Sequence, residues 1–242
     1  MPKGSNSSFN SLFHLLRGRI IVSCQAAEGD PLDDLDTLTR IATSVLRGGA
    51  GGLRAEGTTR IAAFRALTQL PIIGIIKTCD ANGDVYITPD FRSAKAVVDA
   101  GADIVALDCT ARRLTAPEPW TELIPRTHTE LRRPVLADIA SLEDALAAER
   151  AGADAVATTL YGYTTETAGI RSPSWPLLQS LLAHLTVPVL LEGHITHPTE
   201  ALQALDMGAT AVVIGSAITR PETITNRFVQ VTRQTDIQPS SK

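Results

Sequence analysis

Short apolar segments that alternate with longer amphipathic ones constrain the fold of this chain more than any other feature. Each apolar segment has four to six residues, is rich in β-branched side chains, and is apolar at nearly every position. That pattern is typical of parallel strands buried on both faces. The eight segments are IIVSC (20–24), GLRA (52–55), IIGIIK (72–77), IVALD (104–108), VLAD (135–138), AVATT (155–159), VLLE (189–192) and AVVIG (211–215).

The intervening segments have the period of amphipathic helices, as in LDTLTRIATSVLR (35–47), SLEDALAAERA (141–151) and TEALQALDM (199–207). Eight strands, each followed by a helix, predict an α/β fold: a single (β/α)₈ barrel domain, of the TIM-barrel type, over residues 1–242. Residues 1–19 are predicted to form a short helix that covers the bottom of the barrel, and 233–242 a frayed tail. A doubly wound open sheet is the alternative, which the regular repetition disfavours.

Three segments repeat one local pattern: AGADIVALD (100–108), AGADAVATT (151–159) and MGATAVVIG (207–215). Each places a glycine two or three residues before a predicted strand. Glycine adopts the left-handed backbone conformation at little steric cost, and helices commonly end on such a residue. We therefore expect Gly101, Gly152 and Gly208 to end the preceding helices.

Composition excludes several classes of function. The net charge of −4 gives no overall basic field for nucleic acid, and no apolar run approaches the roughly 18 residues that span a bilayer. Three cysteines without CxxC spacing predict free thiols and a cytoplasmic location. No GxGxxG, P-loop or HExxH motif is present, so we expect no metal and no organic cofactor.

Polar residues occur where the predicted strands end. In a (β/α)₈ barrel, catalytic groups lie at the carboxyl ends of the strands, although a polar residue there is as often the chain reaching water. Lys77 and Glu192 follow fully apolar runs, so we expect them to be partly buried, with adjustable pKa values suited to proton transfer. The polar strand-end residues are Gln25, Arg54, Lys77, Asp108, Asp138, Thr158, Thr159, Glu192 and Ser216.

Two glycine turns after the last two strands predict a phosphate site. Barrels commonly bind phosphate with these loops and a short extra helix, where backbone N–H groups approach the anion. Gly193 and Gly215 supply the turns, Ser216 is expected to cap the short helix, and Arg220 follows one turn later and would add a charged contact. The alternative is that these are only tight turns.

Four motifs carry a family resemblance: SCQA (23–26), VYITP (85–89), TTLYGYT (158–164) and GSAITRP (215–221). Together with the strands between them, from about residue 12 to 230, they resemble the N-acetylmannosamine-6-phosphate 2-epimerase family. The segment TCDANGD (78–84) departs from the family pattern, because position 78 lacks the basic residue expected there. His194 stands where many relatives carry a basic residue.

The resemblance implies a cofactor-free isomerase that interconverts N-acetylmannosamine 6-phosphate and N-acetylglucosamine 6-phosphate in sialic acid breakdown. It implies Lys77 as the main acid/base and Glu192 as its acidic partner. Gln25, Arg54 and Asp138 would bind and orient the sugar, and Gly193, Gly215, Ser216 and Arg220 would approach the phosphate. The expected partner is a phosphorylated amino sugar, with no nucleic acid and no membrane. A homodimer is compatible with the sequence, which does not determine the oligomeric state.

Epimerisation at C2 removes a hydrogen from carbon and returns it on the other face. Either one mobile lysine or a lysine and a glutamate on opposite faces could make both transfers, and the sequence leaves these alternatives open. Two other functions compete: a phosphosugar isomerase or aldolase in which Lys77 forms a Schiff base, and a non-enzymatic phosphosugar sensor. Lys77, Glu192, Asp138 and Arg54 occurring together argues against the sensor.

Overall fold

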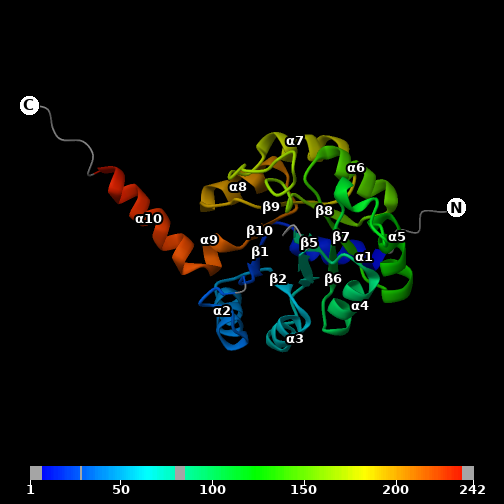
Figure 1. Ribbon diagram of the computed structural model, residues 1–242, viewed down its shortest axis with the longest axis horizontal. Helices are drawn as coiled ribbons and strands as arrows, with labels where there is room; N and C mark the ends of the chain where they lie inside the picture. The colour runs from blue at the N-terminus through cyan, green and yellow to red at the C-terminus, as the bar shows by residue number, and fades with distance from the viewer. Residues whose placement is uncertain (1–6, 28, 80–84, 236–242) are drawn as a thin grey trace, which may run out of the picture.

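The protein is described by a computed structural model at residues 7–27, 29–79 and 85–235. Eight parallel strands form a closed barrel in the order β1-β10-β9-β8-β7-β6-β3-β2, with the helices around it (Figure 1). The barrel strands are β1 (Arg19–Cys24), β2 (Gly52–Glu56), β3 (Ile72–Ile75), β6 (Ile104–Asp108), β7 (Val135–Asp138), β8 (Ala155–Ala157), β9 (Val189–Glu192) and β10 (Ala211–Ile214). The predicted (β/α)₈ barrel is confirmed. The open-sheet alternative is wrong, because β1 pairs with both β2 and β10.

The helices lie where the amphipathic segments predicted them. The segment 35–47 is α2, with Asp34 as its N-cap, and Ser141 caps α6; both side chains accept a hydrogen bond from a first-turn amide. The helices are α1 (Ser7–Leu16), α2 (Leu35–Arg47), α3 (Thr58–Leu67), α4 (Phe91–Asp99), η1 (Ala111–Arg113), α5 (Trp120–Arg126), η2 (Thr127–Leu131), α6 (Leu142–Ala151), α7 (Trp175–His184), α8 (Pro198–Met207), α9 (Ser216–Thr219) and α10 (Pro221–Thr235).

The three repeated glycines end helices as predicted. Gly101, Gly152 and Gly208 follow α4, α6 and α8 with φ angles of 107°, 102° and 112°. These values lie in the left-handed region that favours glycine. Each turn leads directly into a barrel strand, so the local sequence signal sets where the strand starts.

Two apolar layers hold the barrel together. Alternate strand residues, among them Val22 and Leu53, face the helices and form the outer layer. The residues between them, such as Ile73, Leu136 and Leu190, fill the barrel interior. Two residues of α1, Phe13 and Leu16, are buried in the interior cluster. Because side chains alternate with a period of two, polar residues that continue the inward series stand above this core.

The third predicted strand is shorter than expected. It ends at Ile75, and Lys77 begins a separate strand, β4 (Lys77–Cys79), which pairs antiparallel with β5 (Val85–Ile87). The chain leaves the barrel at Ile76, whose backbone N–H donates to Thr88 Oγ1 (3.2 Å) and whose carbonyl accepts from the Thr88 N–H (2.7 Å). The backbone groups of Ile76 therefore bond Thr88, next to β5, and do not continue the barrel strand. Of the loop 78–84, residues 80–84 lie outside the described part of the chain.

Other element ends also differ slightly from prediction. Strand β8 ends at Ala157 and β10 at Ile214, because Thr158 uses its hydroxyl to bond the backbone of Glu192 and Gly215 turns into α9. Helix α10 continues to Thr235, three residues into the predicted tail, and projects away from the barrel (Figure 1). Residues 236–242 lie outside the described part. Within the described residues, no helix is both long and apolar enough to cross a bilayer.

Candidate active site

A cavity of about 520 Å³ opens at the carboxyl ends of the barrel strands. Every residue predicted for the site lines it except Asp138: Gln25, Arg54, Lys77, Glu192, Gly193, Gly215, Ser216 and Arg220. These residues come from the barrel strands β1, β2, β9 and β10 and from the start of β4, which barrel closure brings together. The volume lies within the range of small-molecule sites.

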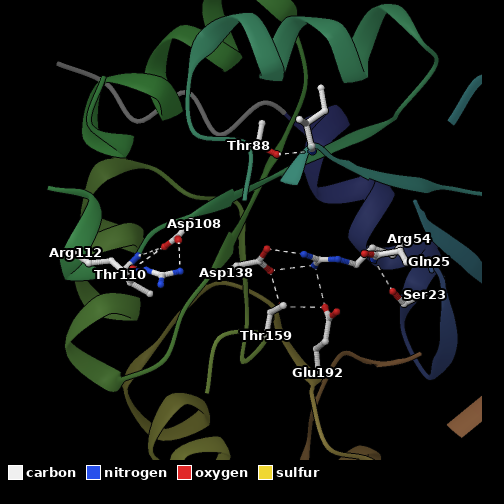
Figure 2. Close-up of polar contacts among 11 residues, drawn as sticks. Ser23, Gln25, Arg54, Thr88, Asp108, Thr110, Arg112, Asp138, Thr159 and Glu192 are labelled. Atoms are coloured by element: carbon white, nitrogen blue, oxygen red, sulfur yellow. Dashed lines mark hydrogen bonds and ion pairs between the residues drawn. The ribbon is translucent and has the colours of Figure 1, made fainter. Parts of the chain in front are cut away.

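The buried guanidinium of Arg54 joins three strand ends (Figure 2). It forms a two-pronged pair with Asp138, from Nη1 to Oδ1 (3.0 Å) and from Nη2 to Oδ2 (2.6 Å). Nη1 also donates to Glu192 Oε2 (2.9 Å). The Thr159 hydroxyl lies within hydrogen-bond distance of Asp138 Oδ1 (2.6 Å) and Glu192 Oε2 (3.0 Å). One cation therefore fixes two carboxylates in the low-dielectric interior.

Glu192 occupies an unusual electrostatic position in this cluster. Burial raises the pKa of its carboxyl to about 7, because the loss of hydration and the nearby Asp138 outweigh the positive charges of Arg54 and Lys77. Burial by itself would lower the pKa of Arg54, but the two carboxylates outweigh that cause and raise it. Arg54 thus stays charged, and Glu192 can take up or release a proton near neutrality.

Lys77 is exposed to solvent, not partly buried as predicted, because the cavity that it lines is open. Although it is exposed, the side chain stands in the cavity, where neighbouring groups displace part of its hydration. The pKa of Lys77 is lowered, first by this loss of hydration and then by the positive charge of Arg54. Arg220 lowers it further, whereas Glu56 and Glu192 act in the opposite direction. A lowered pKa makes the neutral amine, which is the form that accepts a proton, more available.

Ser23 in β1 and Gln25 just after the strand form a polar wall of the cavity. The Gln25 Nε2 atom donates to Ser23 Oγ (2.7 Å), whereas Gln25 Oε1 is buried without a hydrogen-bond partner among the described residues. A buried carbonyl oxygen without a partner is costly, and although the Gln25 residue lines the cavity, this oxygen is not itself open to it.

The predicted glycine turns lie side by side at the cavity. Gly193 has a φ of 104°, and Gly215 turns from β10 into the short helix α9. Helix α9 begins at Ser216, so its N-cap is Gly215. Ser216, the predicted cap, is instead the first residue of the helix. Arg220 follows α9 and also lines the cavity; no described residue is an ion-pair partner of its guanidinium.

Two features of the site differ from the sequence analysis. Asp138 is fully buried and does not line the cavity, and both of its carboxylate oxygens bond the Arg54 guanidinium. The sequence identifies Thr159 only as a strand-end residue, yet it bridges both carboxylates. A sequence signal existed for it: Ala155 and Ala157 face the barrel interior, and Thr159 continues that period of two.

His194 lines the cavity, and its ring makes a contact that the sequence does not predict. Its φ of 58° is unusual for a residue other than glycine, and its ring stacks on Tyr163 with centroids 5.3 Å apart. The side chain also lies 3.1 Å from the Tyr161 carbonyl. In the described part of the chain, no group of three or more His, Cys, Asp or Glu side chains is arranged to hold a metal ion.

Comparisons with known proteins agree on one family. Residues 38–234 match the family model described as "Putative N-acetylmannosamine-6-phosphate epimerase". A relative from Thermosynechococcus vestitus, described in the same terms as a 2-epimerase, is 50% identical over 84% of this chain and 89% of its own length. A similar relative from Clostridium perfringens is 38% identical over 91% of this chain and 99% of its own. The structure of the N-acetylmannosamine-6-phosphate 2-epimerase from Clostridium perfringens superimposes with a TM-score of 0.86 at 37% identity, covering 91% of this chain and 96% of that one.

Proposed function

Because the chain belongs to the N-acetylmannosamine-6-phosphate epimerase family, we propose that it interconverts N-acetylmannosamine 6-phosphate and N-acetylglucosamine 6-phosphate. The observation that carries this proposal is the cavity in which Lys77 and Glu192 stand together, with Glu192 fixed by Arg54. The reaction would belong to the breakdown of sialic acid and related amino sugars.

The proton transfer follows from the chemistry of C2. Its hydrogen is acidic only in the open-chain sugar, where C1 is an aldehyde. The neutral amine of Lys77 takes the proton, the electron pair moves into the C1–C2 bond, and negative charge develops on O1. A proton returned to the opposite face of C2 completes the epimerisation. The lowered pKa of Lys77 favours the neutral amine that starts this sequence.

Glu192 assists from its side of the cavity. With a pKa of about 7, it can donate a proton to a ring or aldehyde oxygen, or exchange one with C2. Its bonds to Arg54 and Thr159 fix the carboxyl group before substrate arrives, which lowers the cost of reaching the reactive geometry. Lys77 is the principal base in this proposal, and Glu192 has the supporting role.

The phosphate orients the sugar from a distance. The turns at Gly193 and Gly215 line the cavity, where their backbone N–H groups would bind the phosphate and Arg220 would add a positive charge. Gln25, which lines the cavity, would bind the sugar through its side-chain amide. Binding energy from groups remote from C2 would hold C2 against Lys77.

A coupled assay tests the proposal directly. Purified protein and N-acetylmannosamine 6-phosphate should yield N-acetylglucosamine 6-phosphate, detected by a deacetylase that accepts only the product. Absence of product with the deacetylase in excess, so that the coupling step does not limit the signal, would refute the proposal. Borohydride treatment during turnover separates the Schiff-base alternative, since the proposed mechanism leaves no reducible adduct on Lys77 and an aldolase would be trapped there.

A further inference from the structure

The lysine of the site is carried by an element outside the barrel sheet. Lys77 lies opposite Ile87 in the β4–β5 hairpin, and Thr78 lies opposite Tyr86. The other charged cavity residues from strands, Arg54 and Glu192, are held within the barrel itself. A two-stranded hairpin is marginally stable without further contacts. The position of the Lys77 amine therefore depends on what holds the hairpin.

Arg112, in the turn η1, contacts the hairpin strand opposite Lys77. Its Nη2 atom donates to the Val85 carbonyl (2.8 Å) and to Asp108 Oδ2 (2.7 Å), which links β5 to the end of β6. The guanidinium carbon also lies 4.6 Å from the centre of the Tyr86 ring, within the range of a cation–π interaction. One side chain thus bonds the backbone of β5 and packs on its aromatic residue.

The turn that carries Arg112 is itself fixed to the barrel. Both the N–H and the hydroxyl of Thr110 donate to Asp108 Oδ1, at 3.1 and 2.6 Å (Figure 2). The Trp120 indole donates to the Thr110 carbonyl (3.1 Å), and the Ala111 N–H donates to Asp144 Oδ1 (3.0 Å). Asp108 is fully buried. Arg112 therefore extends from a turn that is bonded to the barrel, and its contacts connect the hairpin to the barrel.

We propose that Arg112 is a positioning residue for the reaction: through Val85, Tyr86 and Asp108 it fixes the hairpin so that the Lys77 amine faces the cavity. Arg112 is absent from the cavity lining, so it acts through the hairpin and not on the substrate. The inference rests on the proposed function, because it assumes Lys77 as the base. Arginine suits this role better than lysine, since a planar guanidinium can stack and bond two acceptors at once.

Loosening the hairpin has a predictable effect on Lys77. Loss of hydration is the largest cause of its lowered pKa, and Arg54 on β2 and Arg220 after α9 add to it. Glu56 on β2 and Glu192 on β9 oppose the shift. A displaced, better hydrated Lys77 should therefore regain a pKa closer to the ordinary value. Misplacement of a reacting group by about 1 Å can reduce turnover by about 100-fold.

The test compares Arg112→Gln and Arg112→Lys with the wild-type protein in three measurements. Hydrogen exchange reports the amides of 76–79 and 85–88. The pH dependence of Lys77 acetylation by acetic anhydride reports its titration, with the exposed Lys95 as reference in the same sample. Steady-state kinetics separate kcat from KM. In Arg112→Gln we expect faster exchange in the hairpin, a Lys77 titration moved to higher pH, and kcat lowered by about 10- to 100-fold with KM nearly unchanged.

Arg126→Gln is the matched control. Arg126 also lies over an aromatic ring, that of Phe91 at 3.8 Å, and pairs with two carboxylates, but it does not contact the hairpin. It should leave all three measurements unchanged, and Arg112→Lys should give intermediate values. Unchanged hairpin exchange in Arg112→Gln, or faster exchange with unchanged Lys77 titration and kcat, overturns the inference. A wild-type protein without epimerase activity refutes the proposed function instead, while exchange and acetylation still decide whether Arg112 positions Lys77.

Discussion

Lys77 is the residue on which the proposed chemistry depends most. Lys77→Met keeps an unbranched side chain of similar volume and removes the amine, so the fold should survive. We expect kcat to fall by at least about 100-fold, the usual contribution of a general acid–base group. The coupled assay measures the rate, and thermal unfolding checks the fold. A folded variant with more than about a tenth of wild-type activity would move the base to another residue.

Glu192 should make stability depend on pH. Its folded pKa, about 7, is above the value of 4.5 expected in an unfolded chain. A raised folded pKa means that the folded state binds the proton more tightly, so this stabilisation is complete below pH 4.5 and is lost as pH rises through about 7.

Glu192→Gln removes this titration. The difference in Tm between wild type and variant should shift in favour of the variant as pH rises from about 5 to 8, because only the wild type loses its bound proton. Comparing the two proteins at each pH cancels the contribution of the titrating groups that do not interact with Glu192. A Tm difference that stays constant over this range would contradict the raised pKa of Glu192.

At the scale of elements, Arg54 joins β2 to β7 and β9. Arg54→Met leaves two carboxylates close together without their cation, and breaking a buried pair in this way costs about 3–5 kcal/mol. Urea unfolding at pH 7 should therefore show a large loss of stability. Arg54→Met, Asp138→Asn should recover part of that loss, because it removes the uncompensated charge on Asp138. A double variant less stable than Arg54→Met would show that charge is not the cause.

The turns after β9 and β10 should bind the phosphate and take no part in the proton transfer at C2. Arg220→Ala should raise KM for the phosphorylated sugar by about 10-fold or more, since a charged hydrogen bond contributes roughly 1.5–3 kcal/mol. N-acetylmannosamine without phosphate should be a poor substrate for the wild type and equally poor for the variant. Steady-state kinetics on both sugars make the comparison. Equal efficiency of the wild type on the two sugars would mean that these turns bind no phosphate.

At the scale of the whole molecule, the open cavity predicts where the transferred proton comes from. Lys77 is solvent-exposed, so its ammonium protons exchange with water between transfers. Turnover in D₂O should place deuterium at C2 of the product, measured by mass spectrometry. A single lysine base would return some of the original hydrogen, whereas Lys77 and Glu192 on opposite faces would give nearly complete deuteration. A product without C2 deuterium would exclude solvent-exchangeable proton transfer.

The sequence by itself determined the barrel and most of the rim. Strands buried on both faces have a continuous apolar signature, and glycine at a left-handed position marks where helices end, so both signals are local. Closure of eight parallel strands then places their carboxyl ends around one opening. This is why Lys77, Glu192, Arg54 and Gln25 could be assigned to one cavity without any contact being known.

Only the tertiary structure determined the burial, the pKa and the contacts of each of those residues. Asp138 and Glu192 both end barrel strands, yet Asp138 is fully buried and Glu192 lines the cavity, because the depth of a strand end depends on the stagger of its neighbours. The pKa of Glu192 depends on its burial and on Arg54, and these two residues are separated in the sequence by more than half of the chain. The hold of Arg112 on the hairpin of Lys77 is likewise a contact across elements. Such properties arise from the distances between groups, which no local sequence pattern encodes.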